Sequence, residues 1–300
     1  MDTFSIILVV TIYLILPAIF IYGLWRGKFE YKLEWLIQLL AKTFFIVWLF
    51  LAGPWDWFSY YLRYLWLLLL IMAAWQSARR VWVLPWRIPR SFSPIFSTAI
   101  YGVLAVVFGA YLVMVLGSFS IKDEGLDVAF PLKDGTYYVG QGGNHVQMNY
   151  HHAYRPQQYA LDIVKLNRLG ARASGFYPKE LERYAIYGDP LYSPCDAEIV
   201  EVRDGLPDLN PPDRDPDYPE GNYVALRCEE TEPLIYIAHM QQGSIEVKEG
   251  MKVKEGEKIG AVGNSGNTTE PHLHIHAELN GIGVPLTFHG RFLVRNSLVR

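Results

Sequence analysis

Charged residues are scarce in this sequence, and neither sign dominates. Lys, Arg, Asp and Glu make up 19% of its 300 residues, and the formal net charge at pH 7 is −3. A chain so close to neutral does not have the basic surplus that nucleic-acid binding requires. Because 51% of its residues are hydrophobic, the chain is also too apolar to remain disordered.

The scarcity of charge is concentrated in the first part of the chain. Up to about Ser120 the residues are mainly Leu, Ile, Val, Phe and Trp. From Lys122 onward, charged residues, Gly and Pro occur at the density of an ordinary globular domain. A chain of 300 residues corresponds to about two domains. We therefore predict a membrane region over residues 1–121 and a second domain over residues 122–300.

Four apolar stretches in the first domain approach the roughly 20 residues that cross a hydrocarbon core about 30 Å thick. They cover residues 4–25, 35–52, 57–75 and 95–117. The sequence thus predicts a four-helix transmembrane region. Nothing in these stretches indicates transport, so their expected role is to anchor the chain in the lipid bilayer.

Basic residues flank these stretches unevenly. They follow the first and the third stretch, at Arg26, Lys28, Lys32, Arg79, Arg80, Arg87 and Arg90. The opposite ends, at Met1–Asp2 and Gly53–Asp56, carry none. Because Lys and Arg at the ends of membrane helices stay preferentially in the cytoplasm, both termini are predicted to lie outside it. A cleaved signal peptide is disfavoured, since the charges follow the first stretch and no small-x-small site comes after it.

Polar residues in the membrane region have ordinary explanations. Lys42 and Arg63 fall within or near the ends of stretches, where charge is costly, and we expect both to extend toward the membrane interface. Residues 81–94 mix Trp, Arg and Pro. That mixture is typical of a segment at the inner interface rather than of a fifth span.

From about Gly135 the chain has short β-rich runs separated by Gly, Pro and Asp, as in an antiparallel β domain. Strands are predicted over residues 137–139, 146–149, 159–166, 198–203, 223–227, 234–239, 258–262 and 273–279, and one helix over residues 178–185. Cys195 and Cys228 flank two of these strands, and antiparallel pairing would place them nearly opposite each other. They are expected to form either a disulfide, which a location outside the cytoplasm permits, or a pair of buried thiols.

The loop of residues 207–220 contains four aspartates and five prolines. Alternating aspartates suggest calcium binding, but the pattern of an EF-hand is missing. The prolines favour a solvated loop instead.

The segment PHLHIHAEL, residues 271–279, is the most informative in the chain. Successive side chains of a strand point to opposite faces, so its three histidines lie on one face and Leu273, Ile275 and Ala277 lie on the other. The histidines are His272, His274 and His276. Three imidazoles on one face indicate a metal or catalytic site rather than a core.

A catalytic zinc has three protein ligands and one position open for water, so other parts of the chain must contribute. Upstream lie His151 or His152, and Asp162 in an apolar run. A buried aspartate is costly unless it is paired or binds a metal. His239 ends a further predicted strand.

Taken in order, these elements resemble the lysostaphin/LytM family of zinc peptidases. Further matches are the segments GDPLYSP (188–194), GNYVAL (221–226) and VKEGMKVKEGEKIGAVGNSGNT (247–268). The resemblance covers about residues 135–285. It implies a mainly antiparallel domain of the duplicated hybrid motif type, folded as a β-barrel or sandwich.

The resemblance also implies roles for individual residues. It identifies His151, Asp162 and His274 as ligands of one zinc ion, with His152 as the alternative to His151, and it identifies His239 and His272 as the catalytic pair. The sequence departs from the family pattern in the spacing of eleven between His151 and Asp162, where four is common.

Three more residues are candidates for supporting the ligands or contacting the substrate. His276 stands where the family commonly has Glu, which indicates a supporting or groove residue. Asn149 precedes the candidate histidines, and Asn267 lies in a polar turn before the histidine strand. A plain turn explains Asn267 equally well.

The resemblance implies a membrane-bound metallo-endopeptidase that cuts a peptide of peptidoglycan outside the bacterial cytoplasmic membrane. Two other classes of protein fit the same sequence. One is a catalytically silent domain that binds the cell wall or activates another hydrolase. The other is a membrane sensor or scaffold in which the four stretches carry the function.

Overall fold

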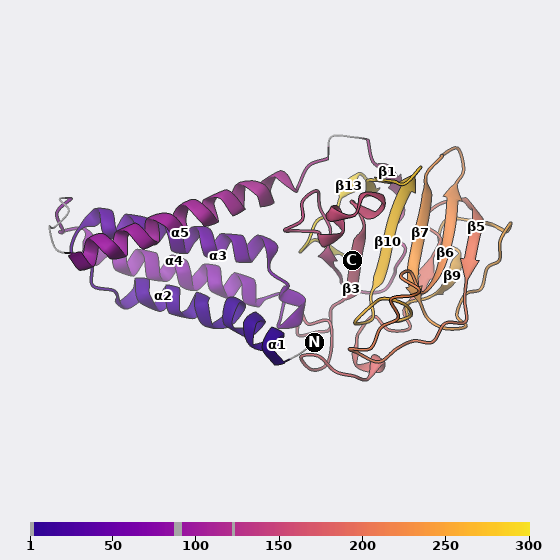
Figure 1. Cartoon of the computed structure of the whole chain (residues 1–300), viewed down its shortest axis with the longest axis horizontal. Helices are drawn as coiled ribbons and strands as arrows, with labels where there is room; N and C mark the ends of the chain where they lie inside the picture. Colours follow the sequence, from indigo (N-terminus) through magenta and orange to yellow (C-terminus); the bar gives the residue numbers. More distant parts are fainter. Residues whose placement is uncertain (1–2, 87–91, 122–123) are drawn as a thin grey trace. The chain divides into compact units, whose positions relative to one another are not determined.

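The computed structural model describes residues 3–86, 92–121 and 124–300. Two compact units make up the chain (Figure 1). The helical unit comprises Met1–Gly53 and Tyr61–Leu116, and the β unit comprises Pro54–Tyr60 and Gly117–Arg300. Residues 87–91 of the predicted interface segment, Met1–Asp2 of the predicted outer end, and Lys122 at the predicted domain boundary lie outside the described residues.

Apolar helices form the first unit. They are α1 (Thr3–Val10), a π-helical turn (Thr11–Ile15), α2 (Leu16–Arg26), α3 (Lys32–Ala52), α4 (Leu62–Val81) and α5 (Phe92–Gly117). Among the described residues, three helical runs are long and apolar enough to cross a membrane: Phe4–Arg26, Lys32–Ala52 and Ile95–Gly117. These correspond to the first, second and fourth predicted stretches.

The third predicted stretch, residues 57–75, needs correction. Its helix is α4, which begins at Leu62, and α4 is not among the helices apolar enough to cross a membrane. Arg63 near its start and Arg79 and Arg80 in its last turn reduce its apolar character. Residues 57–60 are not part of this helix and belong to the β unit.

Lys42 and Arg63, which were expected to extend toward the membrane interface, both have side chains buried within the helical unit. Lys42 is 1% exposed, and its Nζ donates to Oε1 of Gln38 at 2.8 Å. Arg63 is 5% exposed, and its guanidinium carbon lies 3.8 Å from the centre of the Phe50 ring. Both charges therefore have polar or aromatic partners inside the helical unit.

Short strands form most of the second unit. They are β1 (Leu126–Val128), β2 (Tyr137–Gln141), β3 (Leu161–Lys165), β4 (Pro190–Tyr192), β5 (Ala197–Arg203), β6 (Asn222–Cys228), β7 (Leu234–Met240), β8 (Lys252–Val253), β9 (Lys258–Ala261), β10 (Leu273–Leu279), β11 (Ile282–Val284), β12 (Leu286–Phe288), β13 (Arg291–Phe292) and β14 (Leu298–Val299). The main sheet has the order β14-β2-β3-β10-β7-β6-β5-β8, with β11 beside β10. Figure 1 labels its strands β3, β10, β7, β6 and β5. Its described pairs are antiparallel, which confirms the predicted class of this domain.

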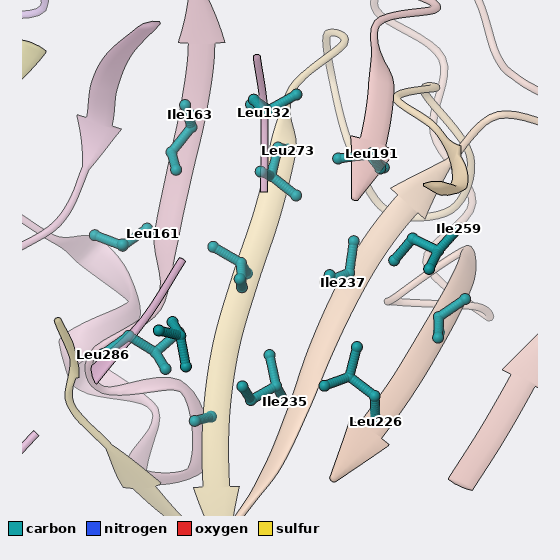
Figure 2. Close-up of a cluster of buried hydrophobic side chains, with 14 of the residues drawn as sticks. Leu132, Leu161, Ile163, Leu191, Leu226, Ile235, Ile237, Ile259, Leu273 and Leu286 are labelled. Atoms are coloured by element: carbon teal, nitrogen blue, oxygen red, sulfur yellow. The ribbon is translucent and has the colours of Figure 1, made fainter. Parts of the chain in front are cut away.

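One face of the main sheet carries the hydrophobic core. Leu273 is paired with Ile163 and Ile275 with Leu161, and all four side chains are at most 1% exposed. Figure 2 shows the labelled leucines and isoleucines of β3, β10 and β7 together in this core. Since side chains alternate along a strand, the residues between them face the other side of the sheet.

Two predicted elements of the β unit are wrong. Residues 146–149 form turns instead of a strand, and residues 178–185 contain a single 3-10 turn, Leu181–Arg183, instead of a helix. A β-bridge between Ala173 and Tyr184 closes the second segment into a loop. The N–H of Ala185 also donates to the carbonyl of Arg172, and the N–H of Ser174 donates to that of Arg183. These contacts outside the segment outweigh its local helical preference.

The two cysteines form a disulfide, which decides between the two alternatives. The Cα atoms of Cys195 and Cys228 are 5.7 Å apart, and Cys228 on β6 pairs with Ala197 on β5. Replacing both cysteines by serine is expected to lower the free energy of unfolding by about 2–4 kcal/mol, because the unfolded chain loses a cross-link. Urea unfolding under oxidising conditions measures this, and a reducing agent should destabilise the wild type but not the variant. An unchanged unfolding midpoint would contradict the prediction.

Candidate metal and catalytic site

The strand register brings Asp162 and His274 to the same face of the sheet. His274 on β10 pairs directly with Asp162 on β3 and with Ala238 on β7. Residues directly opposite each other in an antiparallel pair have their side chains on the same face. The apolar neighbours of both residues therefore point into the core, and the carboxylate and the imidazole meet on the opposite face.

His239 reaches this face through a local irregularity of β7. Regular alternation after Ala238 would direct His239 to the core side. Between the pairs Val224–Ile237 and Asn222–Met240, however, β7 contains one extra residue, and His239 has a φ of 57°. A positive φ is uncommon for a residue other than glycine, and such backbone strain is concentrated at functional sites.

A short turn supplies His151. It lies in the 3-10 helix Tyr150–Ala153, and the Oδ1 of Asn149 accepts a hydrogen bond from its backbone N–H at 3.2 Å. The amide of Asn149, which is fully buried, donates to the backbone carbonyls of Gly143, Gln158 and Ala160. Asn149 thus fixes the turn that orients His151. The spacing of eleven residues between His151 and Asp162 is spanned by this turn and the next one, and does not separate the two side chains.

The polar atoms of these residues converge on Asp162. His151 Nε2 lies 3.0 Å from each carboxylate oxygen, and His274 Nδ1 lies 2.9 Å from Oδ1. One ligand atom from each of His151, Asp162 and His274 lies within 4.8 Å of the others. A second group with the same property consists of His239, His272 and His274. The described residues therefore offer two adjoining sets of metal-ligating atoms that share His274.

The protonation states suit a cation site. Burial opposes ionisation of Asp162, but the adjacent His151 and His272 hold the pKa of its carboxyl well below the usual range. Burial lowers the pKa of His274 to about 4. It also lowers the pKa of His239 well below its ordinary value, with neighbouring imidazoles adding to the effect. A charged carboxylate and neutral imidazoles are the forms in which these residues bind metals.

In the metal-free protein, His274 should stay neutral until the pH falls to about 4, because a lowered pKa delays protonation. Exchange of the imidazole C2 hydrogen, followed by mass spectrometry, measures this titration at single residues. In the urea-unfolded chain the same residue should titrate near its ordinary value of about 6.5. Half-protonation near that value in the folded protein would contradict the burial argument.

His239 and His272 have one ring nitrogen each held by a backbone carbonyl. Nδ1 of His239 lies 2.9 Å from the carbonyl oxygen of Ser265, and Nδ1 of His272 lies 2.9 Å from that of Glu270. A carbonyl oxygen only accepts, so Nδ1 carries the proton in both rings. In its neutral form each ring therefore has its lone pair at Nε2. Nε2 of His272 lies 3.5 Å from Oδ1 of Asp162, and although burial opposes it, this carboxylate raises the pKa of His272 above its ordinary value.

The remaining predicted residues lie in and around this cluster. His276 is 4% exposed, stacks on Tyr236, and places Nδ1 3.1 Å from Nε2 of His274, so it supports His274 from behind. Asn267 lines the same cavity as the cluster. His152 points elsewhere, with Nδ1 3.3 Å from the carbonyl oxygen of Gln158. The structure thus brings His151, not His152, to Asp162.

The cluster opens into a cavity of roughly 520 Å³. Its lining also includes residues of two segments that the sequence pattern did not connect with the site, among them Asp56 and Trp57 from one and Arg214 and Glu220 from the other. Arg214 and Glu220 belong to the proline-rich segment 207–220, which is therefore more than a solvated loop. Its many turn-forming residues gave no signal of this, because the contact depends on the tertiary fold.

Part of the β unit matches a known protein family. Residues 183–285 match the model of peptidase family M23. The peptidoglycan DD-endopeptidase ShyC of Vibrio cholerae is 44% identical over 62 residues, which are 21% of this chain and 14% of that protein. The peptidoglycan DD-endopeptidase ShyA of the same organism is 34% identical over 95 residues, which are 31% of this chain and 18% of that protein. The chain spans less than a fifth of the length of these relatives.

Solved structures of similar sequence include the catalytic domain of lysostaphin from Staphylococcus simulans. It is 27% identical, with 30% of this chain and 59% of that chain covered at a TM-score of 0.24. A zinc containing peptidase from Vibrio cholerae is 22% identical, with 42% of this chain and 48% of that chain covered at a TM-score of 0.26.

Proposed function

Since the chain carries a peptidase domain of family M23, of the lysostaphin/LytM type, we propose that it is a membrane-anchored zinc endopeptidase that hydrolyses peptide bonds of peptidoglycan. The observation that carries the proposal is the convergence of His151 Nε2 and His274 Nδ1 on the carboxylate of Asp162. Two further histidines, His239 and His272, lie beside this group.

The donor set fits zinc. Imidazole nitrogens and a carboxylate oxygen are its usual ligands, and a catalytic site has three of them and one open position. The group of His151, Asp162 and His274 includes a carboxylate, whereas the adjoining group of His239, His272 and His274 has none. We assign the zinc to the first group. A bound zinc lowers the pKa of water to about 7 and polarises a carbonyl oxygen.

His276 holds His274 in the form that a ligand needs. Its Nδ1 faces Nε2 of His274 at 3.1 Å. When Nε2 of His274 carries the proton and donates it to this contact, Nδ1 keeps its lone pair toward Asp162. Such partners behind a ligating histidine fix its tautomer and orientation.

The proposed catalytic pair is His239 and His272. Because backbone carbonyls hold the proton on Nδ1 in both rings, Nε2 of each can accept a proton from an attacking water. Once protonated, the same atom can donate a hydrogen bond to a developing oxyanion. The two ring centres are 4.9 Å apart, so both can act on one scissile bond.

The substrate class rests on the relatives. Two proteins that share part of this sequence are named peptidoglycan DD-endopeptidases. Incubation of the purified full-length protein with cross-linked muropeptides should release products with one new amine and one new carboxyl group, detectable by liquid chromatography and mass spectrometry. A chelator should stop the reaction, and added zinc should restore it.

A catalytically silent wall-binding domain would bind the same muropeptides, yet release no product when fully loaded with zinc. A membrane sensor would differ in another respect, because its isolated β unit would be inert while the helical unit carried the function. The retention of both proposed catalytic histidines beside the candidate ligands favours the enzyme.

We further propose that the β unit and both termini lie outside the cytoplasm of a bacterium. This orientation follows from the basic residues after the first apolar helix and at the end of α4, including Arg26, Arg79 and Arg80. The three helices that are apolar enough to cross a membrane would by themselves place the two ends of the membrane region on opposite sides. The proposed orientation therefore counts α4 as a fourth span despite the charges of Arg63, Arg79 and Arg80. An alkaline phosphatase fused after Arg300 should be active, and cytoplasmic activity of a reporter at this position would contradict the orientation.

A further inference from the structure

The segment Pro54–Tyr60 connects α3 to α4 in the sequence, yet it belongs to the β unit, and three of its residues line the candidate site. We propose that this segment completes the active site. Trp57 forms part of the wall that binds the peptide, and Asp56 is a positioning residue that acts on His272 through Arg172 and Glu270. The proposal rests on the peptidase function and names the residues that determine how its groove holds substrate.

Backbone contacts fix the segment within the β unit at several points. The N–H of Trp55 donates to the hydroxyl of Tyr138 at 3.2 Å, and Trp55 is 1% exposed. The N–H of Tyr60 donates to the carbonyl of Gly170 at 2.7 Å. Between these points, the N–H of Arg172 donates to the carbonyl of Asp56 at 3.0 Å. The segment is therefore part of the folded β unit and not only a connection between two helices.

A buried charge network links the segment to His272. Arg172 is 1% exposed, and its Nε and Nη2 lie 2.8 Å and 2.7 Å from Oε2 of Glu270. Its Nε also lies 3.7 Å from Oδ2 of Asp56, which is 4% exposed. A buried guanidinium requires carboxylate partners, and removing one partner of such a group disturbs the remaining contacts.

The network ends on the catalytic pair. The backbone carbonyl of Glu270 accepts the hydrogen bond from Nδ1 of His272 at 2.9 Å. The carboxylate of the same residue is held by Arg172. The position of this carbonyl, and with it the direction of Nε2 in His272, therefore depends on where Arg172 lies between its two carboxylates. Residues that hold a metal-site residue in place directly change activity by about 10–100-fold. Asp56 reaches His272 only through Arg172 and Glu270, so its effect is expected at the lower end of that range.

Trp57 is an aromatic wall of the cavity. Its ring stacks on Tyr177, with centroids 5.7 Å apart and planes inclined by 6°, and it lies 3.8 Å from the guanidinium carbon of Arg172. The hydroxyl of Tyr177 donates to the carbonyl of Thr269, another residue of the wall. Trp57 is thus held rigidly but stays half-buried beside the site. A preorganised aromatic ring provides contact area for a peptide at little entropic cost.

The two residues should affect different kinetic constants of the full-length protein acting on cross-linked muropeptides. Trp57→Ala is expected to raise KM about tenfold with little change in kcat, because it removes a binding contact. Trp57→Phe should recover most of the loss.

Asp56→Asn should lower kcat about tenfold with KM nearly unchanged. Tyr154→Ala, at an exposed aromatic that does not line the cavity, is the matched control and should leave both constants unchanged.

Zinc content and thermal unfolding separate this role from a general effect on folding. Wild-type zinc content in Trp57→Ala and Asp56→Asn, together with the split between KM and kcat, supports the proposal. Loss of zinc in these variants, or wild-type kinetics, overturns it. If the wild type cleaves nothing, the proposed peptidase function is wrong. The role of Trp57 in binding is then tested separately, by measuring the dissociation constant of the same muropeptide for wild type and Trp57→Ala by calorimetry. An unchanged dissociation constant for Trp57→Ala would then overturn the inference, and a tenfold weakening would support it.

Discussion

Substitution of Asp162 or His151 by alanine is expected to remove the bound zinc and with it all peptide hydrolysis. Asp162 is the centre of the cluster, since His151 and His274 both place a ring nitrogen within 3.0 Å of its carboxylate. Without it, the remaining buried imidazoles provide no negative charge to balance a divalent cation. Zinc in the purified protein, measured by plasma mass spectrometry, should fall from one ion per chain to background.

His152→Ala provides the matched control for this prediction. His152 is the immediate neighbour of His151, but its Nδ1 lies beside the carbonyl of Gln158. This variant should therefore keep both zinc and activity. Loss of zinc in His152→Ala together with its retention in His151→Ala would show that the ligand has been assigned to the wrong histidine.

Substitution of His239 or His272 by alanine should have a different effect. Zinc should remain, because neither residue belongs to the assigned ligand group, while kcat should fall by about 10²–10⁴-fold with the loss of a proton-transfer group. The double variant should cost less than the product of the two single losses, because residues that act as a unit are not additive.

Steady-state kinetics and metal analysis on the same preparations test this pair. Loss of zinc on substitution of either residue would indicate that the ion binds to His239, His272 and His274 instead. Full activity in either single variant would exclude that residue from proton transfer.

The parts of the site that lie on regular strands could be predicted from the sequence. The alternation of histidines and apolar residues in β10 places His274 and His276 on one face, and the observed burial of Leu273 and Ile275 in the core confirms that alternation. An aspartate inside an apolar strand identified Asp162 by the same reasoning. These patterns are local, with a period that the strand geometry fixes.

The parts that depend on tertiary contacts could not be predicted in this way. His239 required a bulge and a positive φ, neither of which its sequence signals. Trp57 was assigned to a membrane stretch because it begins an apolar run, but its segment folds with the β unit. Hydropathy describes the composition of a window and contains no information about which unit a short connection joins.

In the helical unit, too, charge and length predicted some features correctly and missed others. Three predicted membrane stretches have helices that are long and apolar enough to cross a bilayer, whereas α4 falls short. The buried position of Lys42 depends on Gln38, which lies one helical turn away. An average of hydropathy over a stretch counts both residues as unfavourable in a membrane. The hydrogen bond between them, however, compensates part of the free-energy cost of burying their polar groups.

Anomalous diffraction from crystals of the zinc-loaded protein, collected on both sides of the zinc absorption edge, is the most direct test of the assigned metal site. One peak per chain within bonding distance of His151 Nε2, Asp162 and His274 Nδ1 is the predicted result. A peak among His239, His272 and His274 would contradict it. So would the absence of any peak in crystals of a protein whose activity depends on zinc.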